Sequence, residues 1–125
     1  MFFNLAYVAL GGALGACLRY TGGLALIKVF PGPFPMGVWP VNVIGSLLMG
    51  LFVVYSHQKG LTHANLFVMT GLLGGFTTFS AFSLEAMTLI ERGHFGSAAL
   101  YVTVSVLLSI AGLALGVMIA RGIWA

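Results

Sequence analysis

The sequence predicts an all-α integral membrane protein with four transmembrane helices, the third of them broken. Of its 125 residues, 60% are hydrophobic and 6% are charged, and the mean hydropathy is +1.10. Soluble domains carry about a quarter charged residues, so this composition excludes a water-soluble fold. A helix needs roughly 20 apolar residues to cross a bilayer. Apolar segments of about this length or longer lie at about 3–27, 38–56, 64–90 and 97–120. Because the loops are short, residues 1–125 are predicted to form a single four-helix domain in the lipid bilayer.

The charges and the single cysteine exclude other classes of protein. Five Lys or Arg residues oppose two acids, but they are scattered along the chain, so nucleic-acid binding is not expected. Cys17 is alone, so it forms no disulfide within the chain, and it is interpreted as a small apolar residue. The apolar N-terminal run lacks a basic start and is too long for a signal peptide, so cleavage is not expected. No enzyme chemistry is visible.

The first segment carries small residues three and four positions apart, among them Gly11 and Gly15, which allow another helix to approach closely. Arg19 lies on the same face. One interpretation is an arginine whose side chain extends to the membrane surface, since the segment ends about two turns later. The other is a fixed positive charge that attracts an anion into a vestibule, and the scarcity of acids to neutralise the charge supports it.

The second segment places Asn42, Ser46 and Gly50 on one helical face, because these residues lie four positions apart. The Asn42 side chain offers two N–H donors and a carbonyl acceptor. Its amide would either bond a neighbouring helix or donate to a dehydrated anion. Pro40 stands near the start of this helix, where a proline costs least.

The third segment contains the stretch GLLGGFTTFSAFSLE, Gly71–Glu85, in which glycines and hydroxyl residues interrupt an apolar span. Unpaired backbone groups are costly in lipid, so such a stretch is tolerated only against protein or a wet cavity. It therefore predicts a broken helix along a polar path. Phe79 and Phe82 are spaced like packing residues, although the positive edge of an aromatic ring can also coordinate an anion. Glu85 would pair locally, carry a proton or hold a cation.

The fourth segment carries a ladder of hydroxyl groups about one turn apart, on Tyr101, Ser105 and Ser109. This ladder would pass a small anion along the helix or hold a file of water molecules. Gly112 and Gly116 continue the stripe and are interpreted as a seam for helix packing.

The basic residues at the helix ends predict no preferred orientation in the membrane. An excess of Lys and Arg marks the cytoplasmic side. Lys59 and Arg121 belong to one side of the membrane, and Lys28 and Arg92 belong to the other, while Arg19 is not counted because it lies within the first span. We therefore expect both orientations to be inserted, which predicts an antiparallel homodimer. A chain with so few helices also needs a partner to enclose a wide pore.

The third-segment motif, together with Gly15–Arg19 and Asn42–Ser46, closely resembles the Fluc family of fluoride channels, also called CrcB. The resemblance covers nearly the whole chain, with all four helices in order. It implies a dual-topology antiparallel homodimer in a prokaryotic cell (inner) membrane. It further implies two fluoride pores per dimer and a structural sodium ion at the dimer interface. Such a channel exports cytoplasmic fluoride passively and so lowers its toxicity.

The resemblance also implies roles for individual residues. The sodium ion would lie on the backbone carbonyls of Gly74 and Thr77, while the role of Glu85 stays open. The fluoride path would comprise Arg19, Asn42, Thr78, Phe79, Ser80, Phe82, Tyr101, Ser105 and Ser109. Two departures from the family pattern, Ala81 in place of a threonine and the run Gly37–Pro40, bear on the polarity and conduction rate of the pore.

Two other functions fit four short helices. A small dual-topology secondary transporter that exports drugs or cations needs a membrane-embedded acid, usually in its first helix, where this chain has Arg19 and no acid. A non-transporting membrane subunit would explain the glycine seams, but it would leave Asn42 and the third-segment motif without a purpose.

Overall fold

The computed structural model describes residues 1–32, 34–60 and 62–124, and every regular element in these ranges is a helix. Three of the spans are single helices: α1 (Phe2–Val29), α2 (Trp39–Lys59) and α6 (Phe95–Trp124). The third span is built from α3 (Thr62–Asn65), the π-helix η1 (Leu66–Leu73), α4 (Gly74–Phe76) and α5 (Phe79–Glu91).

Within the described ranges, the four spans are each long and apolar enough to cross a membrane. This confirms the prediction of an all-α protein with four membrane-length helices, and the chain is a multi-pass membrane protein. Most helices run a few residues past the predicted spans, because their hydrogen bonding continues into the polar ends of the apolar segments. The C-cap of α2, for example, is Gly60 in the left-handed conformation with φ 63°, which a glycine adopts without strain.

The break in the third span lies at Thr77 and Thr78. Both residues are extended, with φ −94° and ψ 154° at Thr77 and φ −154° and ψ 127° at Thr78. Two weak helix formers, Gly74 and Gly75, precede these β-branched residues, so the helix is locally easy to interrupt. The helix restarts because the Thr78 hydroxyl accepts a hydrogen bond from the Ala81 N–H, at 3.2 Å, as an N-cap.

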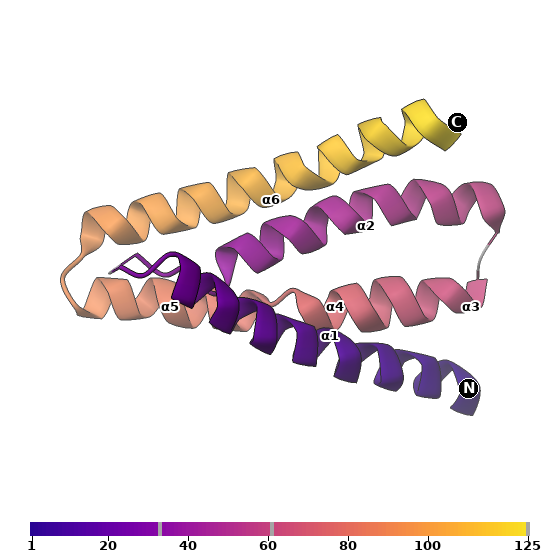
Figure 1. The fold of residues 1–125 in the computed structure, drawn as a ribbon, viewed down its shortest axis with the longest axis horizontal. Helices are drawn as coiled ribbons and strands as arrows, with labels where there is room; N and C mark the ends of the chain where they lie inside the picture. Colours follow the sequence, from indigo (N-terminus) through magenta and orange to yellow (C-terminus); the bar gives the residue numbers. More distant parts are fainter. Residues whose placement is uncertain (33, 61, 125) are drawn as a thin grey trace.

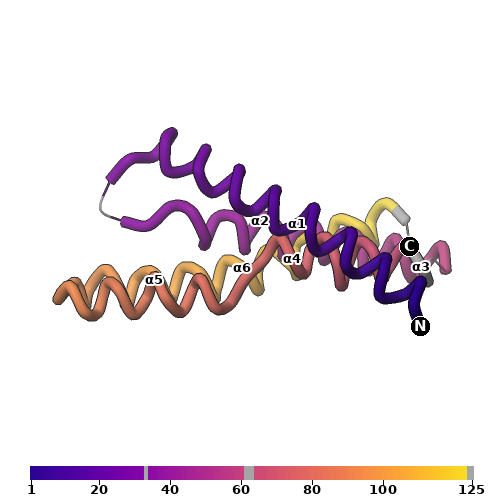
Figure 2. Tube along the Cα trace, turned by 90° about the horizontal axis from the view of Figure 1, so that it is seen from below, coloured from indigo at the N-terminus to yellow at the C-terminus, as the bar shows by residue number. Residues whose placement is uncertain are grey.

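The helices pack in pairs, and the pairs meet at the break. α2 runs along α6, and α1 crosses η1 and α4 on the other side of the molecule, as Figure 1 shows. In Figure 2, α5 lies beside the first half of α6, beyond the point where the third span bends. The two termini share one end of the bundle with the end of α2 and with α3 (Figure 1). Lys59 and Arg121 therefore lie toward that end, and Lys28 and Arg92 lie toward the other.

Glycines bring the paired backbones into direct contact. A Cβ on Gly15 of α1 would clash with the carbonyl oxygen of Leu72, and one on Gly75 would lie 2.6 Å from the carbonyl oxygen of Gly12. A Cβ on Gly116 of α6 would likewise clash with the carbonyl oxygen of Leu47 in α2. These contacts confirm the predicted packing seams of the first and fourth segments.

Few side chains are buried within the chain, and many large apolar side chains are exposed, as suits contact with lipid or with a partner chain. The buried cluster consists of Phe82, Ala86, Leu89, Ala98 and Tyr101, and it lies between α5 and α6. Phe34, Val38 and Trp39, from the segment that leads into α2, pack against it. Val38 and Trp39, which belong to the run Gly37–Pro40 that differs from the family pattern, thus pack against the cluster that contains Phe82 and Tyr101.

Candidate functional site

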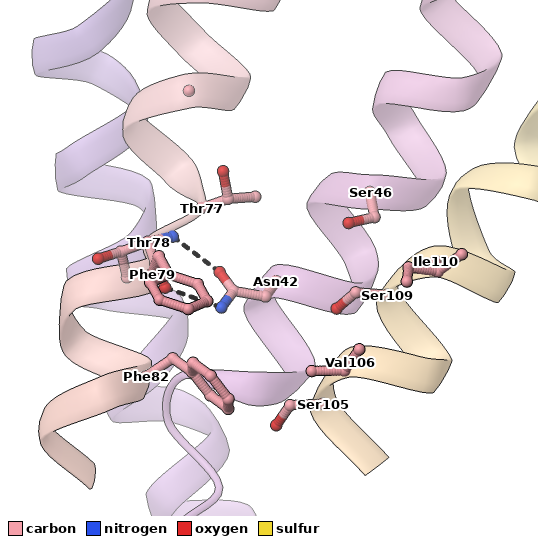
Figure 3. A pocket seen from close by; sticks show the side chains of 11 residues that line it. Asn42, Ser46, Thr77, Thr78, Phe79, Phe82, Ser105, Val106, Ser109 and Ile110 are labelled. Carbon is pink, nitrogen blue, oxygen red and sulfur yellow. Dashed lines mark hydrogen bonds between the residues drawn. The ribbon is translucent and has the colours of Figure 1, made fainter. Parts of the chain in front are cut away.

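A cavity of about 450 Å³ lies at the break of the third span, between that span, α2 and α6. Figure 3 shows Asn42 and Ser46 of α2 with Ser105 and Ser109 of α6 on one side, and the third span opposite them. The lining residues are Asn42, Ser46, Gly74, Thr77, Thr78, Phe79, Phe82, Ser105, Val106, Ser109 and Ile110. Residues from three separate regions of the chain thus meet in one partly polar cavity.

Asn42 bonds the broken backbone with both ends of its side-chain amide. Its Nδ2 donates to the Thr78 carbonyl at 2.9 Å, and its Oδ1 accepts from the Thr78 N–H at 2.8 Å, as Figure 3 shows. Thr78 is extended, so its N–H has no partner within a helix, and Asn42 supplies one. The amide therefore bonds a neighbouring helix, the first of the two predicted alternatives. An amide nitrogen carries two hydrogens, so one donor is left over beside the cavity.

Two phenylalanines form part of the cavity wall, and a tyrosine extends their stack. The ring centroids of Phe79 and Phe82 are 5.3 Å apart with a tilt of 54°. Phe82 stacks on Tyr101 at 5.4 Å and 16°. Phe82 is only 7% exposed, whereas Phe79 is 76% exposed on the single chain. The Phe82 ring is therefore held firmly, and Phe79 presents its ring at the surface beside the cavity.

Hydroxyl groups of two helices also line the cavity. Ser105 is 4% exposed, and its Oγ has no hydrogen-bond partner within the part of the chain that the structure describes. Ser109 lies one turn further along α6. Ser46 lines the cavity as well, although the predicted fluoride path does not include it. Its spacing of four residues from Asn42 was the signal that placed it on this face.

Tyr101 and Glu85 lie behind the wall of this cavity. The Tyr101 hydroxyl donates to Glu85 Oε2 at 2.6 Å, and the Tyr101 side chain is fully buried. Glu85 is thus hydrogen-bonded to a residue of another helix, and it borders a second cavity of about 290 Å³. The predicted hydroxyl ladder is thus divided, because only its two serines line the first cavity.

Arg19 and Ser80 contact the broken segment but do not line the cavity. The half-buried Arg19 donates from Nε to the Gly75 carbonyl at 3.2 Å. The exposed Ser80 places its Oγ 3.1 Å from the Thr78 hydroxyl. Both side chains contact the broken segment, and neither belongs to the cavity wall.

The break frees backbone carbonyls that suit a hard cation. In a continuous helix, the carbonyls of Gly74 and Thr77 would accept from the N–H groups of Thr78 and Ala81. Here those two N–H groups bond Asn42 and the Thr78 hydroxyl instead. Neutral carbonyl oxygens are ligands that hard cations prefer. Among the described residues, no three His, Cys, Asp or Glu side chains gather to form another kind of metal site.

Comparison of the sequence with known proteins places this chain in a family. Residues 6–117 match the family model described as CrcB-like protein, Camphor Resistance (CrcB). A fluoride-specific ion channel FluC from Ruegeria sp. (strain TM1040) is 60% identical over 124 residues, covering 98% of both chains. Proteins of the same description from Roseobacter denitrificans (54% identical) and Agrobacterium fabrum (42% identical) each match over 97% of this chain and 98% of their own. The chain therefore belongs to the CrcB-like family, together with these FluC proteins.

Proposed function

We propose that this protein is a fluoride-selective channel that passively exports cytoplasmic fluoride, with two pores per antiparallel dimer. The observation that carries the proposal is the cavity in which the Asn42 amide, serine hydroxyls and phenylalanine rings meet at a break in a membrane-spanning helix. The relatives named as fluoride-specific channels match this chain over nearly its whole length. The proposed activity is permeation, and it involves no enzyme chemistry.

Fluoride is small and strongly hydrated, so it enters a protein only where donors replace its water. The candidate donors to an ion around the cavity are the second N–H of Asn42 and the hydroxyls of Ser105 and Ser109, of which the Ser105 Oγ is buried in the wall. The unpaired Ser105 hydroxyl is suited to this role, because a buried donor without a partner is costly until an ion or water arrives. Ser46 adds a further hydroxyl on α2.

The ring edges of Phe79 and Phe82 would hold the ion weakly. An aromatic ring has a positive edge, which attracts an anion without a formal charge. Conduction requires sites that bind well enough for entry and weakly enough for exit. The stacking of Phe82 on Tyr101, with Tyr101 bonded to Glu85, would keep the Phe82 edge at a constant place.

Thr78 and Ser80 would act at the break. Thr78 lines the cavity while its hydroxyl caps α5, and the Ser80 hydroxyl is within reach of the Thr78 hydroxyl. These groups would stabilise the restart of the helix beside the path. Arg19 contacts the same segment through its hydrogen bond to the Gly75 carbonyl, and its charge would add at most a small attraction for anions there.

A sodium ion on the carbonyls of Gly74 and Thr77 fits the carbonyls that the break releases. One chain offers two such oxygens, so the opposed partner of an antiparallel dimer would supply the others. Gly74 is exposed on the single chain, as this arrangement requires. A bound sodium ion would satisfy these oxygens and add positive potential near the path.

Passive export follows from the chemistry of hydrogen fluoride. The uncharged acid crosses membranes and dissociates in the more alkaline interior, which traps the anion. An interior-negative potential favours the exit of an anion by about 2.3 kcal/mol per 100 mV. A selective pore is therefore sufficient for export, and no energy source beyond the potential is needed.

The test is fluoride efflux from liposomes that contain only this protein, followed with a fluoride electrode after valinomycin is added. We expect fast fluoride efflux without a pH gradient and no comparable chloride efflux. Absence of fluoride flux from folded protein would overturn the proposal and favour a non-transporting subunit. Flux that requires a pH gradient would instead identify a secondary transporter.

A further inference from the structure

The break leaves a backbone carbonyl, that of Gly75, which receives a hydrogen bond from α1. α4 ends at Phe76, and the next two residues are extended, so the carbonyl of Gly75 lies in the last turn of a helix that does not continue. The last carbonyls of a helix have no partner within it. Here Arg19 Nε donates to the Gly75 oxygen at 3.2 Å.

The glycine seam of α1 sets this contact. Gly11, Gly15 and Arg19 lie four residues apart on one helical face. Gly15 leaves no room for a Cβ, because one would clash with the Leu72 carbonyl and lie 2.8 Å from the Phe76 nitrogen. One turn beyond this point of closest approach, the face reaches Gly75. The position of Arg19 is therefore fixed by backbone packing.

The charge of Arg19 also suits its place. Helix C-termini carry partial negative charge, and a cation near one is stabilising. The helical run that ends at Phe76 has its C-terminus at the break, and Arg19 lies against it. Asn42 holds the other side, at Thr78, from α2. Side chains of two different helices thus clamp the two sides of the break.

We infer that Arg19 is a positioning residue whose Nε–H caps α4 and holds the break in place. Its hydrogen bond engages the Gly75 carbonyl. This oxygen therefore does not join the neighbouring carbonyls of Gly74 and Thr77, which are the proposed ligands of the sodium ion. The inference deepens the proposed function, and it rests on that function where flux is measured. It differs from the vestibule-charge interpretation, because the location of the N–H matters more than the charge.

Three substitutions separate the two interpretations. In Arg19→Gln, the amide nitrogen lies as many bonds from Cα as Nε does, so the donor stays and the charge is lost. In Arg19→Lys, the charge stays, but the nitrogen lies one bond further and a methylene stands where the donor was. Arg19→Met removes both. We expect Gln to keep fluoride efflux within about threefold of wild type, and Lys and Met to lower it roughly tenfold, the effect of one hydrogen bond.

The second readout is the melting temperature of the purified protein, which does not depend on flux. We expect the Gln variant to melt close to wild type and the Lys and Met variants to melt lower. The same three substitutions at Arg121, which is exposed at the far end of α6, serve as controls and should change neither readout. If Met does not fold, the comparison of Gln with Lys decides.

The outcomes are distinct. Efflux retained by Lys and lost by Gln would overturn the inference and support a vestibule charge. Equal values for all variants, or equal loss in Gln and Lys, would also overturn it. If wild-type protein carries no fluoride, the proposed function fails, while the order of the melting temperatures still tests the cap. Gln above Lys in that order would support it.

Discussion

Asn42 bonds the backbone with two of the three hydrogen-bonding positions of its amide, and in the proposed pore the third would serve an ion. Its amide has one acceptor and two donors, and Thr78 uses the acceptor and one donor. Because the amide is bonded on both sides, it cannot rotate away from the cavity. A fixed donor is worth more to a passing anion than a mobile one, since no ordering cost is left to meet.

Asn42→Leu tests this double role. The substitution keeps the approximate size but leaves the Thr78 N–H without its partner, which costs about 1–3 kcal/mol for a buried group. We expect a lower midpoint of unfolding in a detergent titration and a fall of tenfold or more in fluoride efflux. Asn4→Leu, at the exposed start of α1, is the control. Wild-type flux in Asn42→Leu would show that the amide serves only the backbone.

Phe82→Ile tests the phenylalanine wall. Isoleucine keeps the burial but has no positive ring edge, and it loses the stacking on Tyr101, which contributes about 0.5–1.5 kcal/mol. We expect fluoride efflux to be lost while the protein elutes like the wild type in size exclusion. Phe3→Ile, at a position 80% exposed on α1, should conduct normally. Unchanged flux in Phe82→Ile would remove the ring edge from the mechanism.

At the level of elements, the third span is two half-helices held by their neighbours. α1 packs its backbone on η1 and α4, whereas α5 packs on α6. The two halves are thus anchored to different helices, and the extended pair Thr77 and Thr78 joins them. Shifting α1 would therefore move one side of the break relative to the other.

Gly15→Ala tests this anchoring. A methyl group there would clash with the Leu72 carbonyl, so α1 must move away, at a cost of about 1–3 kcal/mol for overpacking. We expect lower stability and a loss of flux, because Arg19 no longer reaches Gly75. Gly22→Ala, on the same helix with no atom within 4 Å, should behave like wild type. Equal effects of the two substitutions would argue against the seam.

At the scale of the molecule, the helix ends on the two sides of the bundle carry two Lys or Arg residues each, with Arg19 lying within α1. Lys28 and Arg92 lie toward one end, and Lys59 and Arg121 lie toward the other. Since Lys and Arg set membrane orientation, neither end is favoured as the cytoplasmic one. This balance supports the proposed antiparallel dimer, in which each pore would be completed by an inverted copy.

C-terminal reporter fusions in cells test the orientation. A reporter that is active only inside and one that is active only outside should both give signal on the wild-type chain. Lys28→Gln combined with Arg92→Gln should leave the basic residues at the other end and shift the C-terminus inside. Signal from only one reporter on the wild-type chain would contradict dual topology.

The sequence by itself determined the membrane class, the four spans and the place of the break. Apolar length reports spans directly, and paired glycines before two threonines inside one of them signal an interruption. Even the family could be inferred from the third-segment motif, and the matches over nearly the full chain confirm it. The glycine seams were also readable, since their spacing follows the helical period.

Only the tertiary structure decided which partner each polar side chain takes. Periodicity placed Asn42, Arg19 and Glu85 on helical faces, but it could not select the group that each one meets on another helix. The structure pairs them with Thr78, Gly75 and Tyr101, all far away in sequence or on another helix. The physical reason is that a polar group in lipid bonds whichever partner the packing brings near, and helix packing is a property of the whole fold.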